Sequence, residues 1–375
     1  MTDVDDSGSI DLGVFIPINN NGWFVSTNAP QYRPSFDLNR EVVQLAEHYD
    51  FNFALSMIKL RGWGGATEFW DYGLESFTLM AGLAAVTKKI KLYASTAVLT
   101  LHPALVARMA VTLDSIAPGR AGINIVTGWL RTEYAQLGLW PGDEHYVRRY
   151  DFAREYVSII RELWETGQSD FKGDYFQLDD CRMKPMPENK IDIVCAGQSA
   201  TGMEFCATYG DYNFVLGAGV NNPEAHADKT EAVRVAVERS GRDVGVFVLL
   251  TVVAAPTTEE AMARWNFYNE AIDVEALAWA GREATFDPRS AQPNAEDSTT
   301  NRAAATVAAP TASIGGGTLV GSYAEVAEML DRAARVPGTK GIMLVFDDFV
   351  RGIDEFGKYV QPLMATRSKI KKADS

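Results

Sequence analysis

The chain alternates short runs of β-forming residues with amphipathic segments of helical period, and this alternation restricts the fold more than any other feature. Several runs are apolar on both faces, as expected of strands that are covered by helices. Eight such units predict an α/β fold, a (β/α)8 TIM barrel, with a doubly wound parallel sheet as the alternative. The runs are IDLGVFIP (10–17), FNFALSMI (51–58), KLYASTAVL (91–99), AGINIVT (121–127), IDIVCAG (191–197), YNFVLG (212–217), VFVLLTVVA (246–254) and GIMLVF (341–346).

We interpret residues 1–375 as a single barrel domain with two additions. Residues 168–190 predict an insertion that carries a hairpin. Residues 281–320 are rich in Ala, Thr, Ser, Pro and Gly, and a loop of that length in a compact domain predicts a lid. The helical pattern before the first addition closes at Gly167, which is a C-cap signal.

Charge and motif content exclude several classes of function. The net charge of −14 argues against nucleic acid or a membrane surface as a partner. The N-terminus MTDVDDSGSI is no signal peptide, and no apolar run approaches a membrane span, so we expect a cytoplasmic protein. The four histidines lack metal-ligand spacing, and we expect no metal. Neither a Rossmann fingerprint nor a P-loop is present.

One strand carries a polar residue where an apolar one is expected. Asn124 lies inside AGINIVTGWLRTEY (121–134), and a buried amide without partners would cost roughly 1–3 kcal/mol. It must therefore be hydrogen-bonded to protein or to a ligand. Trp129 and Glu133 follow just beyond the strand, at the end where barrel enzymes place their functional residues.

Two further segments offer groups suited to an anion. CAGQSATG (195–202) places Ser199 and free backbone N–H groups before a helix. HYVRRYDF (145–152) supplies Arg149 and Tyr150 at a helix start, which is a local positive charge in an acidic chain. An arginine pair that opens a helix is more commonly a solvated surface, so each signal is weak by itself.

Taken in order, the segments resemble the bacterial-luciferase-like flavin monooxygenases from about Leu12 to Leu363. NIVTGW and AGQS are shared with sulfone and alkane oxygenases, whereas LSMIKLRG and TEFWD indicate the pyrimidine-oxygenase branch. The other matching segments are VFIPINNNGW, APQY, ESFTLMAGLAAVT, WPGD, RRYD, SDFKGD, GTLVGSYA and FDDF.

The resemblance implies a set of flavin and oxygen contacts. Arg149, Tyr150 and the Ser199 turn would bind the phosphate of reduced FMN, and Asn124 would meet the edge of the isoalloxazine ring. The chain departs from the family pattern at two positions, with Ser95 in place of Thr and His102 in place of Pro. By motif match the FMN contacts are Ile58, Lys59, Asn124, Glu133, Arg149, Tyr150 and Ser199, and the oxygen pocket beside the flavin N5 is Leu55, Met57, Ser95 and Asn124.

The same resemblance implies the reaction and its partners. With O2 and reduced FMN from a separate NAD(P)H:flavin reductase, the enzyme would open uracil or thymine between N3 and C4, giving ureidoacrylate or its peracid. Trp129 would stack on the pyrimidine and Glu133 would pair with its N–H groups. A homo-oligomer is expected.

Three alternatives remain open at this point. A sibling flavin monooxygenase would act on another cyclic amide, N-heterocycle or halogenated ring, with residues 281–320 carrying the difference. A non-catalytic flavin-binding protein would need no oxygen pocket. A deazaflavin-dependent dehydrogenase shares the fold and would differ in the cofactor that stabilises it.

Overall fold

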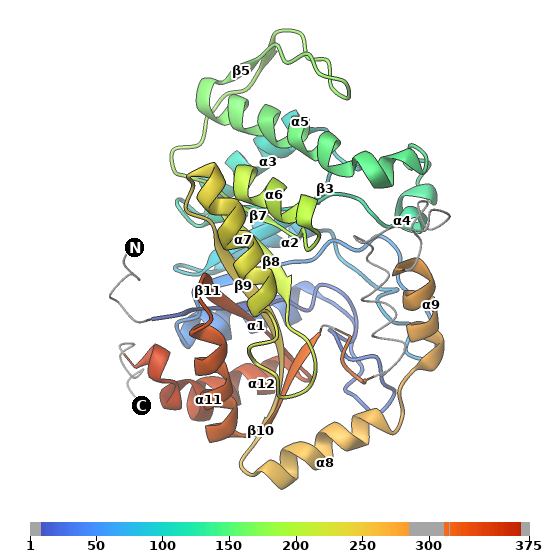
Figure 1. Cartoon of the computed structure of the whole chain (residues 1–375), viewed down its shortest axis with the longest axis vertical. Helices are drawn as coiled ribbons and strands as arrows, with labels where there is room; N and C mark the ends of the chain where they lie inside the picture. Colours follow the sequence, from blue (N-terminus) through green and yellow to red (C-terminus); the bar gives the residue numbers. More distant parts are fainter. Residues whose placement is uncertain (1–8, 285–310, 315, 369–375) are drawn as a thin grey trace.

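Parallel strands close into a barrel in the computed structural model, which describes residues 9–284, 311–314 and 316–368 (Figure 1). Within these residues eight strands pair in the order β1-β2-β3-β4-β7-β8-β9-β11 and back to β1. This closure confirms the predicted barrel and excludes a doubly wound sheet, which would have two open edges. The strands are β1 Asp11–Phe15, β2 Phe53–Leu55, β3 Lys91–Ala97, β4 Ala121–Val126, β7 Asp192–Cys195, β8 Tyr212–Leu216, β9 Gly245–Ala255 and β11 Thr339–Phe346.

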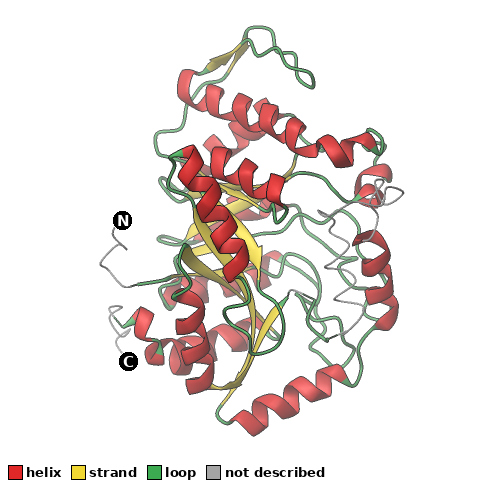
Figure 2. Ribbon diagram, viewed as in Figure 1, coloured by secondary structure: helices red, strands yellow, loops and turns green. Residues whose placement is uncertain are grey.

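Helices surround the barrel, red around yellow in Figure 2. Local sequence explains where several of them begin and end. Ser35 caps α1 by accepting the Leu38 N–H, Thr257 opens α8 with a capping box, and Gly167 ends α5 with φ 72°. The helices are α1 Phe36–His48, α2 Ser76–Val86, α3 Pro103–Ile116, α4 Arg131–Ala135, α5 Glu144–Thr166, α6 Ala200–Tyr209, α7 Ala227–Ser240, α8 Thr258–Asn269, α9 Val274–Ala284, α11 Tyr323–Ala334 and α12 Phe349–Glu355, followed by short turns at Phe356–Val360, Gln361–Leu363 and Ala365–Arg367.

A strand that the sequence did not predict, β10 (Gly317–Ser322), extends the barrel wall. It pairs with residues 250–255 of β9, directly beyond the stretch of β9 that pairs with β8. The two neighbouring chain ends approach so closely that a Cβ on Gly217 would lie 3.0 Å from the Cα of Gly317. The expected lid over 281–320 is therefore too wide: residues 281–284 are helix and 317–320 are strand, while 285–310 lie outside the described residues.

The hairpin expected in residues 168–190 is present as the antiparallel pair β5 (Gln168–Ser169) and β6 (Cys181–Arg182), at the top of Figure 1. Arg108 of α3 donates to the carbonyls of Lys184 and Arg182 at 3.0 and 3.1 Å. Glu155 of α5 accepts three consecutive N–H groups from residues 174–176. These bonds hold the hairpin against α3 and α5.

Aromatic rings fill the barrel at the amino-terminal ends of its strands. Phe247 stacks between Phe53 and Tyr212, with centroids 4.3 and 4.2 Å away, and Tyr93 meets it edge-on. This layer lies at the bottom of the barrel, opposite the carboxyl-terminal mouth, where barrel enzymes place their sites.

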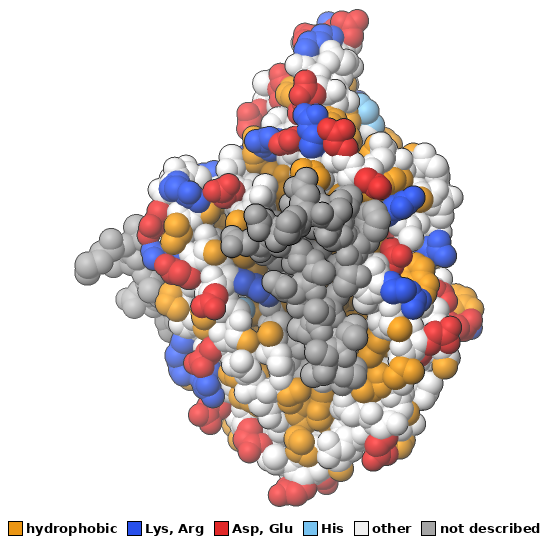
Figure 3. All heavy atoms as spheres, turned by 45° about the vertical axis from the view of Figure 1, so that its right-hand side comes forward, with side chains coloured by type: hydrophobic (Ala, Val, Ile, Leu, Met, Phe, Trp, Pro, Cys, Tyr) orange, Lys and Arg blue, Asp and Glu red, His pale blue; other side chains and the backbone are white. Residues whose placement is uncertain are grey.

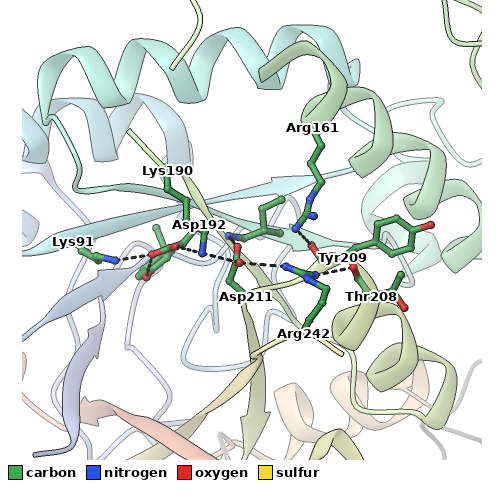
Figure 4. A network of polar contacts seen from close by, with 10 residues as sticks. Lys91, Arg161, Lys190, Asp192, Thr208, Tyr209, Asp211 and Arg242 are labelled. Carbon is green, nitrogen blue, oxygen red and sulfur yellow. Dashed lines mark hydrogen bonds and ion pairs between the residues drawn. The ribbon is translucent and has the colours of Figure 1, made fainter. Parts of the chain in front are cut away.

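A chain of alternating charges crosses the same amino-terminal end (Figure 4). Asp192 pairs with Lys91 at 2.6 Å and with Lys190 at 3.1 Å, and Lys190 also reaches Asp211 at 2.9 Å. Arg242 then joins Asp211, at 3.3 Å, to a carbonyl of α6. The network connects β3, β7 and β8 to α6 and is a structural feature far from the mouth.

The surface carries charges of both signs. Acidic and basic side chains are interspersed over the described part of the face in Figure 3. Among the described residues, no helix combines the length and hydropathy needed to cross a membrane.

Candidate functional site

Asn124 and Ser95 stand side by side on β4 and β3, in register and facing the barrel interior. The Asn124 Nδ2 donates to the Ser95 Oγ at 2.7 Å, and the Ser95 Oγ donates to the Ser56 carbonyl at 2.5 Å. Ser95 is fully buried and Asn124 is 4% exposed. The structure thus brings together two of the four residues expected to form the oxygen pocket. Leu55 is buried at the end of β2, in register with Tyr93 of β3.

The amide of Asn124 is only half satisfied. Its Oδ1 is buried and has no hydrogen-bond partner within the described part of the chain. A buried acceptor left unpaired costs about 1–3 kcal/mol, so a ligand that donates to it would recover that free energy. Within the described residues, the protein therefore satisfies the Nδ2 of Asn124 and leaves its Oδ1 available to a ligand.

Lys59 and Glu133 form a buried ion pair at the mouth. The Lys59 Nζ lies 2.7 Å from Glu133 Oε1, and the two side chains are 7% and 9% exposed. Glu133 also accepts the Leu60 N–H at 3.3 Å. The Lys59 ammonium lies 5.0 Å from the ring centroid of Trp63 and 5.8 Å from that of Trp70.

Tyr150 on α5 faces the amino terminus of α6, and Arg149 precedes it on the same helix. Arg149 is 7% exposed, donates to the Tyr146 carbonyl, and lies 4.8 Å from the Tyr150 ring centroid. Among the described residues no carboxylate pairs with it. A Cβ on Gly202, in the first turn of α6, would come 2.4 Å from the Tyr150 hydroxyl, so Gly is needed there.

Ser199 is the N-cap of α6 and accepts the Gly202 N–H at 3.2 Å. The remaining N–H groups of the first helical turn are left for an anion. The Tyr150 phenol thus lies against the amino terminus of α6, and the buried Arg149 guanidinium lies 4.8 Å from the Tyr150 ring centroid. These are groups that could bind a phosphate monoester.

The remaining residues expected at the site are less buried than Asn124 and Ser95. Met57 and Ile58 are half-buried in the loop after β2, and Trp129 is half-buried just after β4. His102 is the N-cap of α3: its Nδ1 accepts the Ala104 N–H at 3.2 Å, and its ring meets Phe176 edge-on. That capping contact gives this departure from the family pattern a structural role.

Several residues of the site were missed by the sequence reasoning. Ser56 and Ser76 bond to each other at 2.5 Å, and Ser76 accepts the Ser95 N–H at 2.7 Å. His145, one turn before Arg149, places Nε2 within 3.3 Å of the carbonyls of Thr127 and Gly128. Burial lowers the pKa of His145, so the neutral ring is favoured. For His145, the sequence signal was its position four residues before Arg149, which places both side chains on one face of a helix.

The donor set has the complementarity that a flavin mononucleotide requires. One end holds groups for a phosphate, and the other holds a buried amide acceptor inside an apolar barrel. Among the described residues no cluster of three or more His, Cys, Asp or Glu could hold a metal ion. The described residues thus offer a buried guanidinium and helix N–H groups that suit an anion, and a buried amide acceptor that suits a ligand N–H.

Comparison with known proteins gives consistent results. A family model described as luciferase-like monooxygenase matches residues 10–340. Pyrimidine monooxygenase RutA of Bradyrhizobium sp. is 60% identical over 361 residues, covering 96% of this chain and 98% of its own. RutA of Acinetobacter baylyi is 56% identical, covering 96% of each chain.

Solved structures share the fold at low identity. A riboflavin lyase, solved with modified FMN and riboflavin, superposes with a TM-score of 0.82 at 20% identity, covering 98% of this chain and 94% of its own. Long-chain alkane monooxygenase LadA gives 0.78 at 21% identity, covering 99% and 93%. An F420-dependent secondary alcohol dehydrogenase gives 0.70 at 18%, covering 95% and 99%.

Proposed function

The chain belongs to the luciferase-like monooxygenase family, and we infer that it is a pyrimidine monooxygenase that opens uracil and thymine between N3 and C4. The observation that carries this function is identity of 54–60% to pyrimidine monooxygenases along 96% of the chain. A match of this extent includes the barrel, the strand ends and the residues between them. It favours the pyrimidine substrate over the sibling-enzyme alternative.

FMN is the proposed cofactor. Arg149, Tyr150 and the first turn of α6 would hold its phosphate, and the Asn124 Oδ1 would accept a hydrogen bond from its ring system. When bound in its reduced form, FMN supplies the two electrons that O2 needs. The buried Asn124 Oδ1 and the Arg149 guanidinium, which pairs with no carboxylate among the described residues, support a bound flavin because both gain partners from it.

The protein's own groups would orient the reactants and exclude water. Leu55, Ser95 and Asn124 would line the space that admits O2, and Trp129 would form a wall for the flat pyrimidine. The Lys59–Glu133 pair, fixed against Trp63 and Trp70, would hold the loop after β2 closed over the mouth. Fixed dipoles in a dry site stabilise charge that develops on the C4 oxygen.

The proposed stoichiometry balances. Uracil, O2 and two hydrogens from the reduced flavin sum to ureidoacrylate peracid, in which C4 has gained a peroxy group and lost its bond to N3. Reduction of the peracid by two electrons, from a second equivalent of reduced FMN, would then give ureidoacrylate and water. Because the chain carries no nicotinamide-binding fingerprint, a separate NAD(P)H:flavin reductase is the proposed source of reduced FMN.

The test is a coupled reaction under ¹⁸O2 with a flavin reductase, NADH, FMN and uracil. We expect an acyclic ureido acid that carries label from O2, identified by mass spectrometry. A product without label, or turnover of another heterocycle but of no pyrimidine, would contradict the proposed function. Stabilisation by a deazaflavin but not by FMN in thermal unfolding would indicate the dehydrogenase alternative.

A further inference from the structure

The loop between β2 and α2, residues 60–73, is fixed at several points. The backbone N–H of Trp63 donates to the carbonyl of Phe69 at 2.8 Å across the turn. The carboxylate of Asp273, just before α9, accepts both the backbone N–H and the hydroxyl of Thr67, at 2.7 and 2.8 Å. The backbone of this loop therefore has little freedom to move.

The same loop keeps a backbone conformation that costs free energy. Glu68 and Trp70 have φ values of 46° and 61°, in the left-handed region that residues other than glycine rarely adopt. A bulky aromatic residue is especially uncommon there. Such strain persists only where the surrounding contacts impose it, and it is concentrated at functional sites. It favours a role for this loop in binding, beyond the connection of β2 to α2.

The two indole rings of the loop differ in how their N–H groups are used. The Trp70 Nε1 donates to the Gly22 carbonyl at 2.6 Å. The Trp63 Nε1 is buried and has no hydrogen-bond partner within the described part of the chain. An indole N–H can only donate, so the partner that it lacks is an acceptor. The Trp63 ring packs on Phe69 and Trp70, with centroids 5.7 and 4.6 Å away, and these contacts hold it in place.

Trp63 borders the mouth of the barrel. Its ring centroid lies 5.0 Å from the Lys59 ammonium, which pairs with Glu133 of α4 at 2.7 Å. In the barrel, β3 and β4 lie between β2 and β7, and α6 follows β7. With the phosphate assigned to the amino terminus of α6, the loop after β2 borders the part of the mouth that is left for flat rings.

We propose that Trp63 is a specificity-determining residue whose indole N–H donates a hydrogen bond to a ring carbonyl oxygen of the pyrimidine. This inference rests on the proposed function and deepens it. A neutral acceptor suits this place because Glu133 already balances the charge of Lys59. A flat ring without a carbonyl would leave the buried N–H unpaired and bind more weakly. The flavin also carries ring carbonyls, so the test must separate the two rings.

The test uses the full chain with bound FMN and measures its affinity for uracil, 2-thiouracil and 4-thiouracil from changes in flavin absorbance. Sulfur replaces one ring oxygen in each thio compound and is a weaker acceptor. The wild-type chain should bind one thio compound about five- to tenfold more weakly than uracil, as expected for one hydrogen bond. Trp63→Phe keeps an aromatic ring without the N–H. It should bind uracil about five- to tenfold more weakly and lose the discrimination between oxygen and sulfur.

Trp70→Phe is the matched control, because it makes the same change in the same loop. The Trp70 N–H already has a protein partner, so its loss leaves the Gly22 carbonyl unpaired. Trp70→Phe should therefore lower the melting temperature more than Trp63→Phe does, and it should keep the wild-type ratio of affinities for uracil and the thio compound. A purely structural role of Trp63 would instead lower the melting temperature of Trp63→Phe and leave its ratio unchanged.

The outcomes separate this inference from the proposed function. A Trp63→Phe chain that folds, binds FMN and keeps the wild-type ratio would overturn the inference alone, as would equal affinity of the wild-type chain for uracil and both thio compounds. A loss of FMN affinity in Trp63→Phe as large as the loss of uracil affinity would assign the N–H to the flavin and overturn the pyrimidine contact. If the wild-type chain neither binds nor opens any pyrimidine, the proposed function and the inference both fail.

Discussion

The ammonium of Lys59 and the carboxylate of Glu133 lie 2.7 Å apart at the barrel mouth, and both side chains are less than a tenth exposed. They come from the loop after β2 and from α4, so the pair joins two segments that border the site. The free-energy cost of removing each charge from water is offset only while the partner charge is present. The free energy of unfolding should therefore report on this ion pair without any measurement of activity.

Glu133→Gln should lower the free energy of unfolding by about 3 kcal/mol, because it leaves the Lys59 ammonium buried without a counter-charge. The double variant Lys59→Met with Glu133→Leu should recover much of that loss. Urea denaturation of the three chains measures both effects. Equal stability of the single and double variants would show that the two charges do not depend on each other.

Arg149→Ala should weaken FMN binding by roughly 1.5–3 kcal/mol, the range for a hydrogen bond to a charged group. Riboflavin, which lacks the phosphate, should bind both chains with similar, weaker affinity. Arg148→Ala is the matched control because that neighbour is 46% exposed and pairs with Asp151 and Asp174 on the surface. Equal affinity of the wild-type chain for FMN and riboflavin would remove the phosphate assignment.

Asp192 should make stability depend on pH in the acid range. Burial raises the pKa of its carboxyl, but hydrogen bonds and charges from Lys91 and Lys190 outweigh it and lower the pKa below the ordinary value of 3.8. Its contribution is therefore present above the unfolded-state pKa and is lost as the pH falls through the lower folded-state pKa.

Asp192→Asn should accordingly cost most stability near neutral pH and progressively less below about pH 4. Thermal unfolding of both chains between pH 2.5 and 7 measures this convergence. Asp37→Asn, at an aspartate whose side chain is 80% exposed, is the control and should show little change. A gap between wild type and Asp192→Asn that widens as the pH falls would contradict the assigned direction.

Asn124→Ala should abolish ring opening and leave hydrogen peroxide release from the reduced flavin, because the amide positions the reactants and is not the source of electrons. Ser95→Thr should preserve or improve the ratio of ring opening to peroxide, since it keeps the hydroxyl and adds a methyl group that excludes water. Peroxide and ureido product are quantified in the same reaction with a flavin reductase. Full coupling in Asn124→Ala would show that the amide has no such role.

Without a reductase the purified chain should oxidise NADH at no more than the background rate of free flavin. Turnover should appear when a separate NAD(P)H:flavin reductase is added, and it should also appear with FMN reduced chemically under anaerobic conditions and then mixed with O2. The second arm separates a need for reduced flavin from a need for a particular partner protein. Efficient NADH oxidation by the chain alone would contradict the two-component proposal.

Local pattern was enough to predict the barrel. Alternation between period-2 and period-3.6 segments is written in neighbouring residues, and eight such units have few ways to bury both faces of their strands. The same reasoning missed β10 because GTLVGS is short and glycine-rich and follows a low-complexity stretch. Only its pairing with β9 makes it a strand.

The sequence by itself determined that Asn124 needed a partner, since a polar amide in an apolar strand has a fixed cost wherever the strand is placed. Only the tertiary structure decided which end of the amide is satisfied. That outcome depends on Ser95, on a carbonyl of Ser56 and on a helix start at Ser76, three groups on separate elements. Their meeting follows from closure of the barrel, a long-range event that no local periodicity encodes.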